Sequence, residues 1–150
     1  MLSFKQFIGE AKKPILDHQQ SPEDISDAKE VSHGLSTYGP LRIHSHDKID
    51  AQIDSFQKPH KTEKIPLDKV KITADHGRRI NDTKLLNKPI IAMKLHDGTY
   101  HTLDGQHRVL THREAGHTHV HASIVSPKWI KGAGIRGKSS HFTNGDLENT

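Results

Sequence analysis

The sequence predicts a mixed α/β (α+β) fold, in which short strands and helices share one small core. First, the segment PIIAMKLHDGTYHTLD, residues 89–104, has a strand-like run on either side of Asp97-Gly98, a dipeptide that favours a two-residue hairpin turn. Second, residues 107–115 have helical character, and the alternating stretch HTHVHASIV, residues 117–125, follows them. The order strand, turn, strand, helix, strand is typical of a small mixed sheet with a helix packed on it.

Length and composition limit the core and exclude several kinds of site. The chain has 150 residues, of which 31% are hydrophobic, so we expect one domain with a small core. The sequence contains no cysteine, which excludes disulfides, thiolate metal sites and cysteine nucleophiles. It has no apolar run near the roughly 20 residues of a membrane span and no pattern typical of a signal peptide. We therefore expect a cytoplasmic protein without a membrane partner.

The chain divides into three segments by pattern and composition. Residues 1–59 predict a helical N-terminal extension and linker, because Ser21 before a proline marks a helix start and residues 46–57 have helical apolar spacing. Residues 60–127 carry the strand and helix patterns of the folded domain, and residues 128–150 predict a flexible basic tail. The net charge of +4 suits a polyanion. The tail is therefore a candidate DNA contact, and the N-terminal segment a candidate protein contact.

Two strand predictions depend on local pattern alone. The stretch IPLDKVKIT, residues 65–73, alternates and is β-branched, so it predicts a single strand near the start of the domain. Across a two-residue turn at Asp97-Gly98, Leu95 should lie opposite Tyr100.

Five consecutive residues that could form a binding or catalytic site come at the end of the second strand of the hairpin: Asp104, Gly105, Gln106, His107 and Arg108. A helix that begins here presents backbone amides and the positive end of its dipole, where anions bind. The glycine lets a ligand approach the backbone, and with the glutamine it supplies amides. The arginine offers a planar fork to phosphate oxygens, and the histidine can contact phosphate or act as acid or base. The aspartate can hold a metal or accept from a hydroxyl.

The same residues also have a purely structural interpretation. In it, Asp104 caps the helix, Gly105 makes the turn, and the three side chains after them are solvated. Composition alone favours this interpretation, and it stays open at this point.

A family resemblance favours the phosphate site. The string LDGQHR, residues 103–108, with PIIAMKLHDGTYHT before it and VLTHREAGHTHVHASIV after it, resembles the ParB/sulfiredoxin superfamily over about residues 63–126. The string DGQHR also resembles the signature of DGQHR-domain proteins linked to DNA phosphorothioation. The resemblance implies a ParB/sulfiredoxin-like fold with a bound nucleotide, ATP or CTP, and Mg²⁺.

The resemblance also implies roles for particular residues. Kinase members of the superfamily use an acidic residue before the hairpin, and Asp75 is the nearest candidate. Arg78 and Arg79 in the same segment would add phosphate contacts. Together with Asp75, Asp104 and His107 form the expected catalytic set, and Asp104 is the expected metal ligand. The sulfinic acid reductase members are excluded, because their catalytic cysteine is absent.

Two functions of different classes follow from these observations. The first is cleavage or transfer of a phosphoester or phosphoanhydride, by a ParB-like nuclease, an NTPase or a small-molecule kinase. The second is a non-catalytic binding module with the same fold, such as a phage structural or host-interaction protein. The N-terminus is similar to those of many phage proteins, and a phage-encoded chain would act in the host cytoplasm or the virion.

Two further motifs match the patterns of known binding sites, but their sequence context does not favour those sites. The string GAGIRGKS, residues 132–139, matches the P-loop pattern, but neither a buried strand before it nor a helical stripe after it is indicated. His117, His119 and His121 fall on one face of a predicted strand, and such pairs can chelate zinc. No acidic partner lies nearby in the sequence, so an exposed polar strand face explains the alternation equally well, and Zn²⁺ is not favoured.

Overall fold

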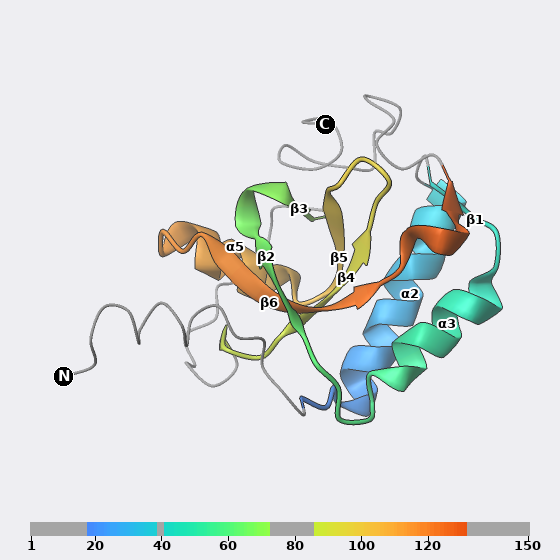
Figure 1. Cartoon of the computed structure of the whole chain (residues 1–150), viewed down its shortest axis with the longest axis horizontal. Coiled ribbons are helices and arrows are strands. Elements are labelled where there is room, and N and C mark those ends of the chain that lie inside the picture. The colour runs from blue at the N-terminus through green and yellow to red at the C-terminus, as the bar shows by residue number, and fades with distance from the viewer. Residues whose placement is uncertain (1–17, 39–40, 73–85, 132–150) are drawn as a thin grey trace.

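A five-stranded mixed sheet forms the centre of the fold, with helices on both of its faces (Figure 1). The computed structural model describes residues 18–38, 41–72 and 86–131. This architecture confirms the mixed α/β class that the sequence predicts. The strand order is β2 (Glu63–Pro66), β6 (His119–Val125), β4 (Ile90–Lys94), β5 (Tyr100–Asp104) and β3 (Val70–Lys71).

The order of elements in the second half of the chain is the predicted one. β4 and β5 pair antiparallel as a hairpin, and α5 (Gln106–Glu114) then carries the chain to β6. β6 lies on the other side of β4 and pairs with it in parallel. The outer pairs are β2 with β6, which is antiparallel, and β3 with β5, which is parallel.

The register of the β4–β5 hairpin differs from the predicted one by one residue. Lys94, not Leu95, lies opposite Tyr100. Leu95 N donates to Thr99 O at 2.8 Å, and Gly98 N donates to Leu95 O at 3.1 Å, so three residues form the loop. Gly98, the last residue of this loop, has a positive φ of 89°. A three-residue loop with glycine in the left-handed region is a common alternative to the two-residue turn.

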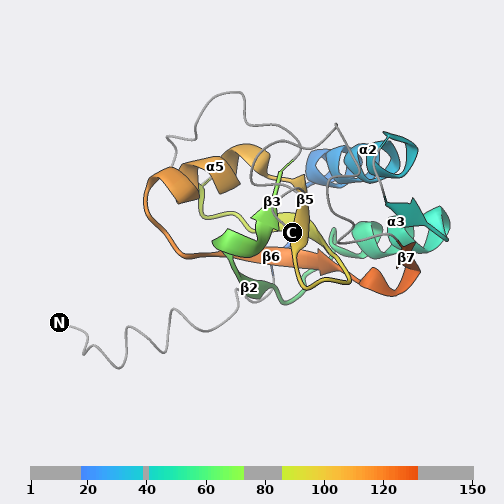
Figure 2. The same ribbon diagram turned by 90° about the horizontal axis from the view of Figure 1, so that it is seen from above.

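One short segment supplies both outer strands of the sheet. The predicted single strand at residues 65–73 is instead β2 and β3, separated by the 3₁₀ turn η1 (Leu67–Lys69), which we call the edge turn. The outer strands of a flat five-stranded sheet lie about 19 Å apart. Four residues of chain reach at most about 14 Å. The sheet is therefore curled, and β2 and β3 approach each other (Figures 1 and 2).

Hydrogen bonds from the region of α5 hold the edge turn in place. Arg113 Nη2 donates to Leu67 O at 3.5 Å and also to Val70 O. Leu67 N donates to Thr118 O at 2.8 Å, just before β6 begins. Leu67 and Val70 are themselves buried, so the turn is fixed by apolar packing as well as by hydrogen bonds.

Two helices, α2 (Pro22–Tyr38) and α3 (His46–Ser55), lie side by side on one face of the sheet (Figure 2). The Ser21 hydroxyl accepts from Asp24 N at 3.1 Å, so the predicted start of α2 is confirmed. The helix predicted at residues 46–57 is α3. The apolar cluster on this face contains Ile25, Ala28, Leu35, Ile49, Ile53 and Phe56 from the helices and Ile91, Met93, Leu103 and Val125 from the strands.

The predicted division of the chain differs from the observed one at both boundaries. The helical part of residues 1–59 shares its core with β4, β5 and β6, so it is an integral layer of the fold and not an extension of a domain at 60–127. The predicted tail, 128–150, also begins inside the fold. β7 (Ile130–Lys131) pairs with β1 (Arg42–Ile43), and Ile130 is buried. Long-range pairing of this kind has no local sequence signal.

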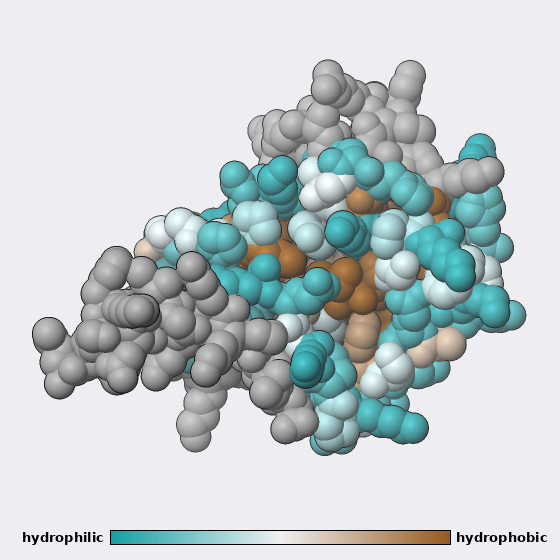
Figure 3. Space-filling model, in the orientation of Figure 1, coloured by the Kyte–Doolittle hydropathy of each residue, from teal (hydrophilic) through white to brown (hydrophobic). Residues whose placement is uncertain are grey.

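Figure 3 shows hydrophilic side chains over most of one face of the described residues, with apolar atoms visible in gaps between them. None of the helices in the described ranges is long and apolar enough to cross a membrane.

A buried histidine in β5 predicts a loss of stability in acid. His101 is 0% exposed, and burial lowers its pKa to about 4, with the charge of Lys71 acting in the same direction. As the pH falls, the imidazole of His101 is therefore protonated in the unfolded chain before it is protonated in the folded chain. The stability that the neutral imidazole contributes is lost as the pH falls from 6.5 towards 4. We expect this group to lower the free energy of unfolding by about 3 kcal/mol across that window.

The pH dependence of urea unfolding measures this effect. In the variant His101→Asn, the fall in the free energy of unfolding between neutral pH and pH about 4 should be smaller by the stated amount. His119→Asn, at an exposed position of β6, should leave the dependence unchanged. If the free energy of unfolding falls equally with pH in the wild type and in His101→Asn, the loss of stability in acid does not come from His101.

Candidate functional site

A cleft of about 380 Å³ lies between α2 and the junction of β5 with α5. The continuous segment 102–108 forms one side, and Asp27 and Val31 from α2 form the other. A β-bulge precedes the junction, because Ile91 and Ala92 on β4 pair with residues 104 and 102 on β5. Bulges redirect side chains next to functional sites. The five predicted loop residues, Asp104 to Arg108, thus all line one cleft.

Gly105 makes the turn from β5 into α5 and is required there by its conformation and its surroundings. Its φ is 103°, in the left-handed region that favours glycine. A Cβ at this position would lie 2.6 Å from Ile90 Cγ2 and 2.7 Å from Arg108 Nη2. The chain can therefore bend sharply here only because this residue has no side chain.

The N-cap residue of α5 is Gly105, which has no side chain with which to cap the first turn. The structural interpretation in which Asp104 caps the helix is therefore wrong. Backbone amides in the first turn of a helix have no acceptor within the helix, and here they border the cleft.

Asp104 and Arg108 form a buried ion pair at the cleft. Arg108 Nη2 donates to Asp104 Oδ2 at 3.1 Å, and the two side chains are 9% and 12% exposed. The structural interpretation expected a solvated Arg108 side chain, but this side chain is buried. Arg108 is also one of the residues that line the cleft. Arg108 Nε has no hydrogen-bond partner among the described residues, and neither has Oγ1 of Thr102, which also lines the cleft.

The carboxylate of Asp104 is easier to protonate than an ordinary aspartate. Burial raises its pKa to about 6, and the charges of Asp24 and Asp27 on α2 act in the same direction, against the opposing charge of Arg108. Asp24 itself is paired with Lys88 at 3.0 Å. Burial alone would raise the pKa of Asp24, but its contacts with Lys88 bring it below the ordinary value. The α2 side of the cleft is therefore acidic.

The remaining predicted loop residues lie at the mouth of the cleft. Gln106 and His107 are both partly exposed and line it from the first turn of α5. The backbone carbonyl of His107 accepts from Thr111 Oγ1 at 2.9 Å, within the helix. His107 is thus partly exposed at the cleft.

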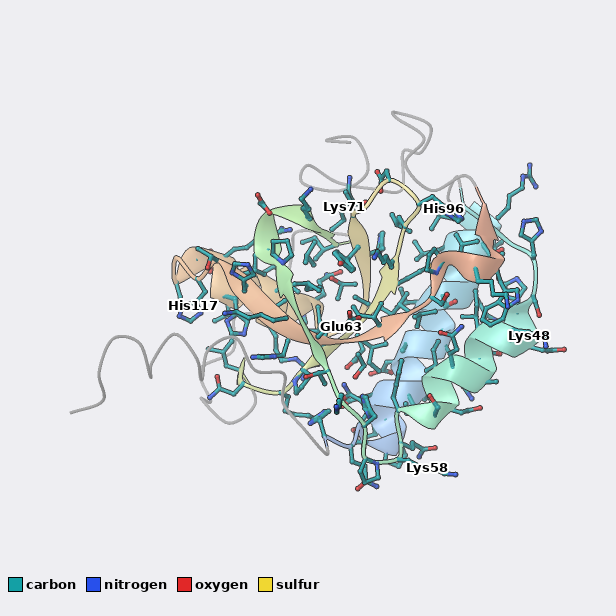
Figure 4. The ribbon with its side chains drawn as sticks, viewed as in Figure 1. Lys48, Lys58, Glu63, Lys71, His96 and His117 are labelled. Carbon is teal, nitrogen blue, oxygen red and sulfur yellow. The ribbon has the colours of Figure 1, made fainter. Side chains whose placement is uncertain are left out.

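The histidines considered for zinc do not form a metal site in the described part of the chain. His117 lies before β6, and its Nδ1 is 2.8 Å from Nδ1 of His112 on α5. His119 Nδ1 is 2.9 Å from Thr118 Oγ1. No group of three His, Asp or Glu side chains in the described ranges is placed to hold a metal. Figure 4 shows His117 at the end of the sheet remote from α2 and α3.

Three of the predicted residues lie outside the described ranges. Asp75, Arg78 and Arg79 all fall between residues 72 and 86, so their expected roles stay predictions. The P-loop-like string at residues 132–139 also lies outside them.

Sequence reasoning missed the half of the cleft that α2 supplies. Asp27 and Val31 lie more than 70 positions before the loop they face. Both lie on a helix that the start signal at Ser21 does predict. Nothing local in the sequence indicates which face of that helix turns towards the loop.

Comparison of the chain with protein-family models, with curated proteins and with solved structures finds no match. The fold and the cleft therefore carry the functional argument.

Proposed function

We propose that the cleft binds the phosphate groups of a nucleotide. The observation that carries the proposal is the start of α5 after the N-cap glycine, which borders the cleft together with two buried polar groups, Arg108 Nε and Thr102 Oγ1, that have no hydrogen-bond partner among the described residues. Backbone amides and a guanidinium bind phosphate oxygens in this arrangement. The resemblance to the ParB/sulfiredoxin superfamily supports the same ligand.

The residues of the cleft fit Mg²⁺ bound together with the nucleotide. Mg²⁺ keeps several waters and is held by one or two carboxylates plus substrate phosphates. Asp104 lines the cleft and could supply carboxylate oxygens. A site with more protein ligands is not indicated, because no group of three such side chains is placed for a metal in the described ranges. The bound ion would neutralise part of the charge of the phosphates.

The chemistry that suits this site is cleavage or transfer at a phosphoester or phosphoanhydride bond. His107 borders the cleft from the first turn of α5, where an imidazole can give or take a proton. Asp104 would position the metal or the attacking hydroxyl. A nuclease, an NTPase and a small-molecule kinase share these roles.

Thermal unfolding with ATP, CTP and GTP, each with MgCl₂, tests the proposal. Ligand at about 100 times its Kd stabilises the folded state by about 2.7 kcal/mol, so the matching nucleotide should raise the Tm by several degrees. His107→Ala should reduce the shift, and it should slow phosphate release from that nucleotide by about a hundredfold. His119→Ala, at an exposed position outside the cleft, is the matched control.

The two readouts separate the two classes of function. A Tm shift without phosphate release would exclude an NTPase and leave a non-catalytic binding module or an enzyme that needs a second substrate. No shift with any of the three nucleotides would contradict the nucleotide proposal as a whole.

A further inference from the structure

The buried end of the cleft is supplied with hydrogen-bond donors. Arg108 is 7% exposed and Thr102 is 3% exposed, and both line the cleft. The Nε–H of arginine can only donate, and the Thr102 hydroxyl can donate as well. Neither atom has a hydrogen-bond partner among the described residues. Both atoms are themselves buried, so a ligand reaches them only if these side chains shift, and it must then bring oxygen acceptors.

The opposite side of the cleft is acidic and more open. Asp27 is exposed and lines the cleft from α2. Glu23 lies one turn earlier, in the first turn of the same helix, and its neighbour Asp24 is paired with Lys88. Val31, one turn later, adds an apolar contact. A ligand that fits both sides therefore has oxygen acceptors at one end and hydrogen-bond donors at the other.

A free nucleotide has oxygen acceptors at one end and hydrogen-bond donors at the other, and a nucleic-acid strand does not. All the phosphates of a nucleoside triphosphate are at one end, and the sugar hydroxyls are further along the molecule. A strand carries phosphates on both sides of each sugar, so it would bring a second negative charge to the acidic side of the cleft. Like charges brought together at short range repel. Carboxylates, by contrast, accept hydrogen bonds from ribose hydroxyls, as in dinucleotide-binding sites.

We propose that the cleft takes a single free ribonucleotide, phosphate end first, and that Asp27 accepts hydrogen bonds from its sugar hydroxyls. This inference rests on the proposed function, and it adds a choice between ribose and deoxyribose and between a free nucleotide and a strand. A hydrogen bond to a charged group contributes about 1.5–3 kcal/mol. Because Asp27 is exposed, we expect the lower end of that range, which is about a tenfold preference for the ribonucleotide.

Titration calorimetry of the full chain with matched nucleotide pairs tests the inference. The pairs are ATP with dATP, CTP with dCTP and GTP with dGTP, each with MgCl₂, and a single-stranded DNA oligonucleotide is the competitor. The wild type should bind one ribonucleotide about tenfold more tightly than its deoxy partner. In Asp27→Ala, that ratio should fall to about one while the deoxynucleotide keeps its affinity. Glu30→Ala, which removes an exposed charge of α2 outside the cleft, should keep the wild-type ratio.

Each contrary outcome has a distinct meaning. Equal binding of ribonucleotide and deoxynucleotide by the wild type would overturn the inference and leave the proposed function standing. Equal weakening of both by Asp27→Ala would also overturn it, because that pattern makes Asp27 a metal ligand and not a sugar contact. Displacement of the nucleotide by the oligonucleotide at similar concentration would show a strand-binding site. Absence of binding by every nucleotide would overturn the proposed function and the inference together.

Discussion

Replacement of Gly105 by alanine should lower the free energy of unfolding by about 3 kcal/mol. Two costs combine at this position. The φ of 103° is strained for any residue with a side chain, and the new Cβ would lie 2.6 Å from Ile90 Cγ2 in the core. Urea unfolding followed by circular dichroism measures the change.

Two other glycines serve as matched controls for Gly105→Ala. Gly98 and Gly116 also have positive φ values, of 89° and 80°, but nothing lies within 4 Å of a Cβ at either position. Alanine there should cost only the backbone strain, about 1 kcal/mol. If all three substitutions cost the same, the steric part of the argument is wrong.

Replacement of Arg108 by methionine should cost about 3 kcal/mol at pH 8, because it leaves the carboxylate of Asp104 buried without its cation. The cost should be smaller at pH 5. Burial already raises the pKa of Asp104 to about 6, and loss of the arginine raises it further, so the carboxyl is neutral in acid. Asp104 therefore opposes folding as the pH rises through its folded-state pKa. Urea unfolding at both pH values checks this dependence.

A double-mutant cycle isolates the contribution of the ion pair. Asp104→Asn removes the buried charge, so Arg108→Met should cost markedly less in that background than in the wild type. Lys29→Met provides the control, since its pair with Asp54 has side chains that are 33% and 51% exposed. Exposed pairs contribute under about 1 kcal/mol. Additive costs for Arg108→Met and Asp104→Asn would show that the two residues are not coupled.

Local chemistry made the second half of the fold predictable. The hairpin, the turn at Gly105 and α5 follow one another without long connections, and each has its own sequence signal. The register of the hairpin was missed by one residue, because an Asp-Gly pair suits both a two-residue and a three-residue loop. The pattern at residues 65–73 was misleading for a different reason. Apolar alternation continues through the edge turn, whose buried leucine satisfies the pattern without being in a strand.

The candidate site was predictable only on one side. Residues 104–108 are adjacent in the sequence, so their common place at the cleft was predictable, as was the i, i+4 spacing that brings Arg108 to Asp104. The ion pair between them was not expected, because it depends on the burial of both side chains. The acidic side comes from α2, and its placement depends on packing against the whole sheet. Sequence pattern identifies such a helix but not the partner it faces.

The edge turn also governs how the sheet opens. In a flat sheet each outermost strand can detach by itself and offer its free amides to another molecule. Here both outermost strands belong to residues 63–71, and Arg113 ties the link between them to α5. Detachment of one strand therefore loosens the other, so amide hydrogens at the two margins should exchange with solvent at similar rates. The curl brings those margins together, and a second copy of the chain gains little access for intermolecular strand addition.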